Sequence, residues 1–153
     1  MMLLLLGILL GSFALLAAVD AVRSPERRFG AARRGQISLA LVFLFTGLGH
    51  FVRTAAMAEM LPPWTPGRTL VIWISGLVEW LLAIGLLIPR WARPAGVAAM
   101  VFLVLVFPGN VYAAINRVEF GGHGAGPIYL LVRAPFQLLL IWWAYWFAVR
   151  RVR

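Results

Sequence analysis

Five long apolar stretches, separated by short polar linkers, make up almost the whole chain. They cover about residues 2–22, 36–57, 69–89, 94–116 and 127–149. Each is close to the roughly 20 residues that a helix needs to cross a bilayer, and none shows the apolar–polar alternation of a barrel strand. The pattern predicts an all-α membrane protein with five transmembrane helices in a single membrane domain, residues 1–153.

Two of the linkers contain residues that interrupt helices. Three prolines lie in the linker 61–67, and four glycines surround His123 in the linker 120–126. The first linker cannot be helical throughout. The second is interpreted as a flexible loop, with His123 as a solvated loop residue. Because the linkers are short, neighbouring helices are expected to pack antiparallel.

Composition supports the membrane assignment and excludes several classes of function. The chain is 63% hydrophobic and only 12% charged, against about 25% charged residues in ordinary soluble domains. The net charge is +9, but the basic residues are all Arg and flank apolar stretches. Membrane topology therefore explains them better than nucleic-acid binding does. Without cysteine, the chain has no disulfide, thiolate metal site or thiol redox chemistry.

The distribution of arginine predicts the orientation. Ten arginines lie on one side of a five-span map: Arg23, Arg27, Arg28, Arg33, Arg34, Arg90, Arg93, Arg150, Arg151 and Arg153. The opposite linkers contain Arg68 and Arg117, each with a Glu nearby. The positive-inside rule then predicts a multi-pass protein of a bacterial cytoplasmic (inner) membrane, with the N-terminus outside and the C-terminus in the cytoplasm.

The first stretch is interpreted as a retained helix rather than a signal peptide. No basic residue precedes its apolar run, and that run is too long. Gly7 and Gly11 form a pattern of small residues four apart, which favours close helix packing. It could dock the helix on its own bundle or serve a dimer.

Five polar residues fall at similar depth inside the last four stretches. At about 1.5 Å per residue, His50 lies about 10 Å, Glu79 about 15 Å, and Asn110 and Arg133 about 9 Å from the outer ends of their helices. Gln137 is one turn deeper than Arg133 and on the same face. Charge inside a membrane is costly unless it is paired or lines a cavity, so these residues are the candidate site.

Two prolines mark the same layer. Pro108 and Pro135 each remove a backbone donor, which leaves the carbonyls of Val104 and Leu131 without their helical partners. In lipid such carbonyls need other donors. Polar side chains of the layer are able to serve.

A purely structural interpretation of the layer is simple. Glu79 and Arg133 would form a buried ion pair, directly or through water, and His50 and Asn110 would complete a network that only fixes helix register. Arg53 would be an interfacial anchor whose head group reaches the membrane surface.

The functional interpretation is a cavity that opens to the outside or the outer leaflet. Glu79 forms its floor, the other four polar residues its walls, and the loops 58–68 and 117–126 its roof. His50 would then donate or accept a proton. A metal site of His50 and Glu79 is less favoured because no third ligand stands at a diagnostic spacing.

At these residues the chain resembles the DoxX-like membrane protein family. One matching string lies in each of the last four stretches: Gly47-Leu48-Gly49-His50-Phe51, Ser75-Gly76-Leu77-Val78-Glu79, Phe107-Pro108-Gly109-Asn110-Val111-Tyr112 and Arg133-Ala134-Pro135-Phe136-Gln137. Gly109 stands where the family has Ala, and Ala134 where it has Leu.

The resemblance implies a four-helix core over residues 36–149, with residues 1–22 as an additional helix. The family's recurring polar positions map onto His50, Glu79, Asn110, Arg133 and Gln137. It implies no firm activity. Some relatives are subunits of quinone-linked sulfur oxidation, others resemble partners of oxidative-stress proteins, and distant eukaryotic relatives assist receptor assembly.

The leading hypothesis is a non-enzymatic one, in which the polar pocket binds a small amphiphilic or lipid-like ligand or a partner's transmembrane helix. The first alternative is a membrane subunit of a quinone-linked oxidoreductase, in which His50 and Glu79 handle quinol protons and a separate subunit supplies the redox centre. The second is a structural membrane assembly factor. No catalytic or metal-ligating residue and no resident cofactor is predicted, although the pocket would suit a quinone or a lipid. The expected surroundings are the lipid bilayer and a membrane-protein partner or a second copy of the chain.

Overall fold

The computed structural model describes residues 1–151, which are helical apart from short connections. The long helices are α1 (Met2–Val22), α2 (Gly30–Val52), α4 (Arg68–Leu87), α5 (Ala92–Ile115) and α6 (Leu130–Ala144), the last continued by the π-helix η4 (Tyr145–Arg150). The short elements are η1 (Pro25–Arg27), α3 (Thr54–Ala58), η2 (Pro89–Trp91) and η3 (His123–Tyr129). Five helical segments of the described chain are long and apolar enough to cross a membrane. The predicted fold class, an all-α protein with five membrane-spanning helices, is confirmed.

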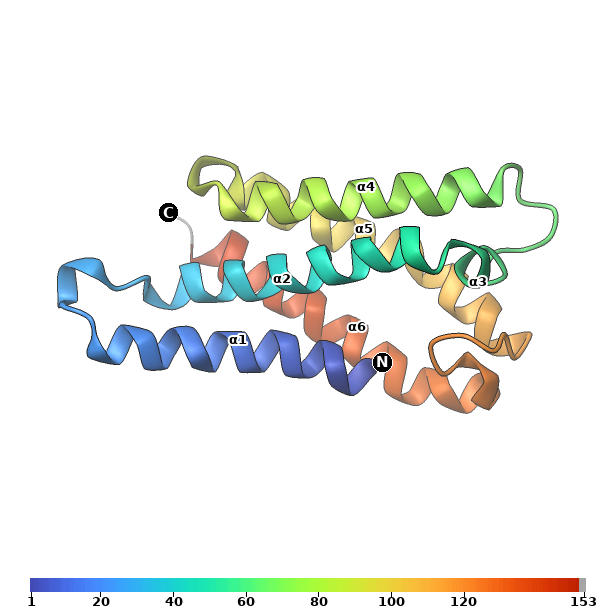
Figure 1. The fold of residues 1–153 in the computed structure, drawn as a ribbon, viewed down its shortest axis with the longest axis horizontal. Helices are drawn as coiled ribbons and strands as arrows, with labels where there is room; N and C mark the ends of the chain where they lie inside the picture. Colours follow the sequence, from blue (N-terminus) through green and yellow to red (C-terminus); the bar gives the residue numbers. More distant parts are fainter. Residues whose placement is uncertain (152–153) are drawn as a thin grey trace.

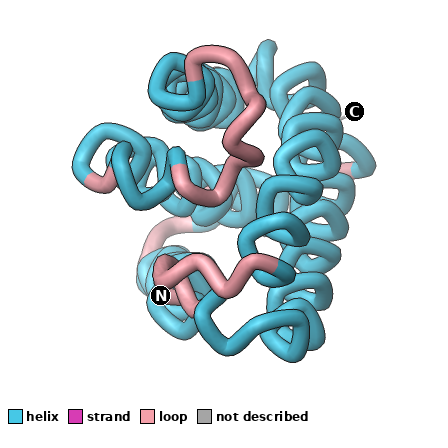
Figure 2. The backbone as a smooth tube through the Cα atoms, turned by 90° about the vertical axis from the view of Figure 1, so that its right-hand side faces the viewer, coloured by secondary structure: helices cyan, strands magenta, loops and turns pink. Residues whose placement is uncertain are grey.

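Successive long helices run in alternating directions. α1, α2 and α4 lie side by side, while α5 and α6 lie behind and across them (Figure 1). The linkers 23–29 and 88–91 and the C-terminal end lie at one end of the bundle, and α3 and η3 lie at the other (Figure 1). Viewed from that second end, the short segments and connecting loops cover the ends of the long helices (Figure 2). We call the end with α3 and η3 the loop end and the other the arginine-rich end.

Several helix boundaries differ from those predicted. α2 begins at Gly30 rather than 36, because its first two turns extend past the apolar stretch. It ends at Val52, where Arg53 leaves the helical conformation with φ −122° and ψ 32°, and the short α3 follows. The last segment changes to a π-helix at Tyr145, which the apolar pattern does not indicate.

The most extensive helix contact joins α2 and α4, and glycines allow it. A Cβ atom added to Gly47 would lie 2.5 Å from the Trp80 ring, and one added to Gly76 would lie 2.7 Å from Cβ of His50. Small residues let two backbones approach closely inside a bilayer. Glu79 lies one turn from Gly76 and His50 one turn from Gly47, so the crossing brings these two polar residues together.

α1 packs on the bundle through its large side chains rather than its glycines. Leu5 and Leu9 are buried, and the Phe13 ring lies 5.3 Å from that of Trp143. Added Cβ atoms at Gly7 and Gly11 would meet nothing within 4 Å. The prediction that this glycine pattern docks α1 on its own bundle is therefore wrong, because these glycines lie on its outward face.

Side-chain hydrogen bonds fasten the arginine-rich end. Arg33 donates to the carbonyls of Leu86 and Leu87, the last residues of α4, at 3.3 and 2.6 Å. Gln36 donates to the carbonyl of Phe147 in the π-helix at 3.1 Å. These donors satisfy helix-terminal carbonyls that lack intrahelical partners. These hydrogen bonds link α2 to α4 and to η4 at the arginine-rich end of the bundle.

Candidate functional site

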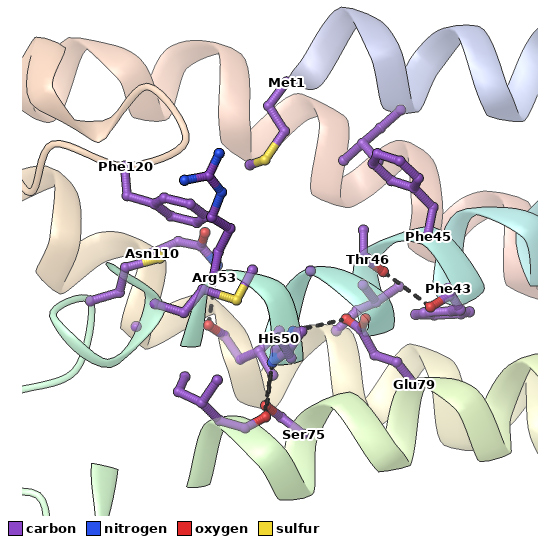
Figure 3. Close-up of a pocket in the computed structure, with 18 of the residues that line it drawn as sticks. Met1, Phe43, Phe45, Thr46, His50, Arg53, Ser75, Glu79, Asn110 and Phe120 are labelled. Atoms are coloured by element: carbon purple, nitrogen blue, oxygen red, sulfur yellow. Dashed lines mark hydrogen bonds and ion pairs between the residues drawn. The ribbon is translucent and has the colours of Figure 1, made fainter. Parts of the chain in front are cut away.

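His50 is held by two polar groups of α4. Its Nδ1 lies 3.0 Å from the carbonyl of Ile72 and 2.8 Å from the Ser75 hydroxyl oxygen, which itself lies 2.8 Å from the same carbonyl. If the hydroxyl donates to the carbonyl, Nδ1 carries a proton; if it donates to Nδ1, the proton is on Nε2. These contacts fix the plane of the imidazole and point Nε2 away from Ser75 (Figure 3).

The other ring nitrogen faces a carboxylate. Nε2 of His50 lies 3.7 Å from Oε1 of Glu79, which is too long for a hydrogen bond but within ion-pair distance (Figure 3). Both side chains are nearly buried, with 14% and 11% of their surfaces exposed. The carboxylate thus lies opposite the ring nitrogen that does not face Ser75 and Ile72.

Arg133 contacts Asn110 rather than Glu79. Its Nε donates to Oδ1 of Asn110 at 3.0 Å, and Asn110 donates in turn to the carbonyl of Val106, one turn back, at 3.2 Å. No ion pair within 4.0 Å joins Arg133 to Glu79 in residues 1–151. A direct contact between them is therefore wrong, because the α2–α4 crossing places Glu79 next to His50 instead. A contact through water stays a prediction.

Gln137 satisfies a backbone carbonyl near Pro108. Its side-chain amide donates to the carbonyl of Leu103. We expected a side-chain donor for the carbonyl of Val104, which Pro108 deprives of its partner, and the structure supplies one for the residue before it. The part of α5 just before Pro108 is thus hydrogen-bonded to α6 inside the bundle.

His123 was expected to be solvated, and this is wrong. It is only 1% exposed, its Nδ1 lies 2.7 Å from the carbonyl of Phe120, and its ring packs edge-on against Tyr129 with centroids 4.8 Å apart. Gly121 and Gly122 adopt φ of +67° and +109°, which side-chain-bearing residues rarely do. The loop interpreted as flexible is a set of defined turns wrapped around Tyr129, whose hydroxyl donates to the carbonyl of Gly121 at 2.7 Å.

A cavity of about 630 Å³ lies between the helices in the half nearer the loop end. All five polar residues singled out from the sequence line it: His50, Glu79, Asn110, Arg133 and Gln137. His123, Ser75 and Arg53 line it as well, and its remaining walls are largely apolar. Arg53 is exposed and therefore lies at the rim of this cavity. The sequence predicted an interfacial anchor at this position but no contact with the cavity.

Three buried polar atoms around this cavity have no hydrogen-bond partner. They are Oε2 of Glu79, Nε2 of His123 and Oε1 of Gln137. In the described part of the chain only one other buried side-chain atom, Nε of Arg34, shares this condition. Buried polar groups are normally paired. Three of the four exceptions among the buried side-chain atoms of the described residues therefore belong to residues that line this cavity.

Sequence reasoning missed His123 and Ser75. The signal for His123 was the cluster of glycines around it followed by Tyr129, since glycines with positive φ allow a tight turn around an aromatic ring. Ser75 is one turn from Glu79 on α4 and faces the same side. Among the described residues, no group of three or more His, Asp or Glu side chains could hold a metal ion.

Comparison with known families places the chain in one of them. Residues 39–148 match the family model described as a domain of unknown function, DUF8561, and the chain belongs to this family. The match includes all the cavity-lining polar residues and leaves out α1. Searches of curated proteins and of solved structures found no match. The class of protein is thus a multi-pass membrane protein of the DUF8561 family.

Proposed function

We propose that the cavity binds a small amphiphilic or lipid-like ligand, with the polar head group at the buried layer and the apolar part against the hydrophobic walls. The observation that supports this most strongly is the set of three unpaired polar atoms, on Glu79, His123 and Gln137, around a single cavity. Leaving a buried polar group unpaired costs about 1–3 kcal/mol. Donors on the head group, or water molecules that the head group holds in place there, would recover much of that cost.

A network that only fixed helix register would favour a different arrangement. In such a network the polar groups would hydrogen-bond to one another and leave little empty space. The reason is that a partly satisfied buried polar network is less stable than a well-packed apolar core. The cavity and its unpaired polar groups therefore favour a binding protein over a structural assembly factor. A partner's transmembrane helix is a weaker candidate than a small molecule, because the polar groups lie inside the bundle rather than on its lipid-facing surface.

The second candidate is a membrane subunit of a quinone-linked oxidoreductase. The observation that favours it is the ion-pair distance between His50 and Glu79 inside a cavity at membrane depth. Such a pair could take a proton from a bound quinol while a separate subunit accepted the electrons. On this proposal the chain is not an enzyme on its own.

We further propose that the chain is DoxX-like, with a four-helix core at residues 36–149 and α1 as an addition. The support is the order and register of the four matching strings, which contain six of the cavity-lining polar residues. We also propose that the arginine-rich end faces the cytoplasm of a bacterial inner membrane, so that the loop end and the cavity lie toward the outer leaflet.

Native mass spectrometry of the protein released from gentle detergent tests the binding proposal. We expect a reproducible mass increment from a bound amphiphile. Val106→Trp should remove it, because Val106 lines the cavity, whereas Val104→Trp should keep it, because Val104 is 58% exposed and does not line the cavity. A wild-type protein that carries no ligand in any mild detergent, or one whose increment survives Val106→Trp unchanged, would overturn the proposal.

A further inference from the structure

The exposed apolar residues that line the cavity lie mainly on α1 and α2. They are Met1 and Leu4 at the start of α1 and Phe45, Leu48 and Val52 on α2, together with Val71 on α4 and Leu105 on α5. The three α2 residues are spaced three and four apart and thus share one face. Figure 3 shows Met1 and Phe45 on the side of the cavity next to α1.

This side of the cavity lies at membrane depth. Phe45, Leu48 and Val52 belong to a segment that is long and apolar enough to span the bilayer, and their side chains are 42%, 50% and 67% exposed. An opening bordered by such residues meets lipid chains rather than water. The route is therefore suited to a molecule that is already dissolved in the membrane.

The α6 wall of the cavity presents a cation with free donors. Arg133 uses Nε for Asn110, and its two terminal nitrogens make no hydrogen bond with any described residue. The contact with Asn110 holds the guanidinium in place without occupying the pair of N–H groups that matches a carboxylate.

The charges around the cavity favour an acidic ligand. Arg133 and Arg53 line it together with a single carboxylate, that of Glu79. Arg53 is exposed at the rim, where water can solvate its charge. Glu79 lies at ion-pair distance from His50 and not from Arg133, so among the described residues the Arg133 guanidinium has no carboxylate within 4.0 Å. A buried charge without a partner is costly, so an anionic head group is preferred to a neutral one.

We propose that the ligand is a long-chain carboxylate whose head group binds Arg133 and whose tail leaves the cavity between α1 and α2 into the surrounding lipid. This rests on the proposed binding function and names the class of ligand and its orientation. The cavity volume of about 630 Å³ lies within the range of roughly 300–1,000 Å³ that small-molecule sites show.

Photolabelling in lipid nanodiscs tests the proposal with two matched probes. One is palmitic acid with a diazirine in the middle of its chain, and the other is the corresponding alcohol. The acid should label Phe45, Leu48 and Leu4, and unlabelled palmitate should compete it away. The alcohol should label at least about tenfold less, because it lacks the charge-assisted hydrogen bonds to Arg133.

Variants separate the head group from the opening. Arg133→Gln should reduce labelling by the acid to the level of the alcohol, and Arg133→Lys, which keeps the charge but not the planar fork, should give an intermediate value. Leu48→Trp should obstruct the opening and lower labelling of the other opening residues. Leu41→Trp, on the same face of α2 two turns deeper and outside the cavity, is its control.

The contrary outcomes are distinct. Saturable labelling confined to Met60, Leu61 and Phe120 would show that the tail points to the loop end, which overturns the lateral orientation while ligand binding stands. Equal labelling by acid and alcohol would overturn the carboxylate. If neither probe labels the cavity saturably but native mass spectrometry finds another amphiphile, this inference alone fails. If native mass spectrometry also finds none, the proposed function fails with it.

Discussion

Gly47 and Gly76 face each other where α2 crosses α4. A Cβ atom added to Gly47 would lie 3.1 Å from the carbonyl oxygen of Gly76, and one added to Gly76 would lie 3.2 Å from the carbonyl oxygen of Gly47. The two backbones are therefore nearly in contact. Because His50 and Glu79 each follow one of these glycines by three residues, the glycine contact also sets the distance between the imidazole and the carboxylate.

Gly76→Ala should destabilise the bundle by about 1–3 kcal/mol, since the new methyl group would lie 2.7 Å from Cβ of His50 and the helices must separate. The unfolding transition in detergent measures this. Gly7→Ala is the control, because nothing lies within 4 Å of its added methyl group. Equal stability of the two variants would contradict close packing at the crossing.

A double-mutant cycle on His50 and Glu79 should give a coupling free energy of about 0.5–3 kcal/mol, because Nε2 of His50 lies 3.7 Å from Oε1 of Glu79. The variants are His50→Gln, Glu79→Gln and their combination, compared by unfolding in detergent. The cycle of Glu79→Gln with Arg133→Gln should give a smaller value. A larger coupling for Glu79 and Arg133 would show that these two are the true partners.

The depth of the polar layer could be predicted from the sequence, but its pairing could not. Counting residues along each apolar stretch places His50, Glu79 and Arg133 at similar heights, because the helical rise is nearly constant. Which of them touch depends on how each helix is rotated about its axis. For α2 and α4 this rotation is set by the contact between Gly47 and Gly76, which are distant in sequence.

The loop end was harder to predict than the spans. Glycines in a linker indicate either flexibility or backbone conformations with positive φ, and composition does not distinguish the two. In this loop the glycines adopt positive φ, and Tyr129 contacts both the backbone of Gly121 and the ring of His123. The end of α2 at Arg53 could not be predicted either, because residues 50–56 contain neither glycine nor proline.

His123→Ala should lower stability by about 1–3 kcal/mol, because it removes a buried ring that packs on Tyr129 and a hydrogen bond to the carbonyl of Phe120. Glu119→Ala, an exposed change in the same loop, should stay within about 0.5 kcal/mol of the wild type. Chemical unfolding of both variants side by side gives the comparison. Identical stabilities would mean that the ring of His123 contributes nothing to the loop.

Cysteine labelling should show that the arginine-rich end is cytoplasmic. The chain has no cysteine, so single substitutions at the exposed positions Ser24 and Trp64 report cleanly. In intact cells a membrane-impermeant maleimide should modify Trp64→Cys and spare Ser24→Cys until the cells are lysed. The reverse pattern would invert the topology and put the cavity in the inner leaflet.

The most direct test of the central claim is a crystal structure of the protein grown in a lipidic phase and solved at a resolution that separates water from ligand. The account predicts one elongated density that begins near Arg133 and continues along apolar walls. Separate water molecules that bridge Glu79, His123 and Gln137, with no continuous density beside them, would contradict it and leave a hydrated structural network.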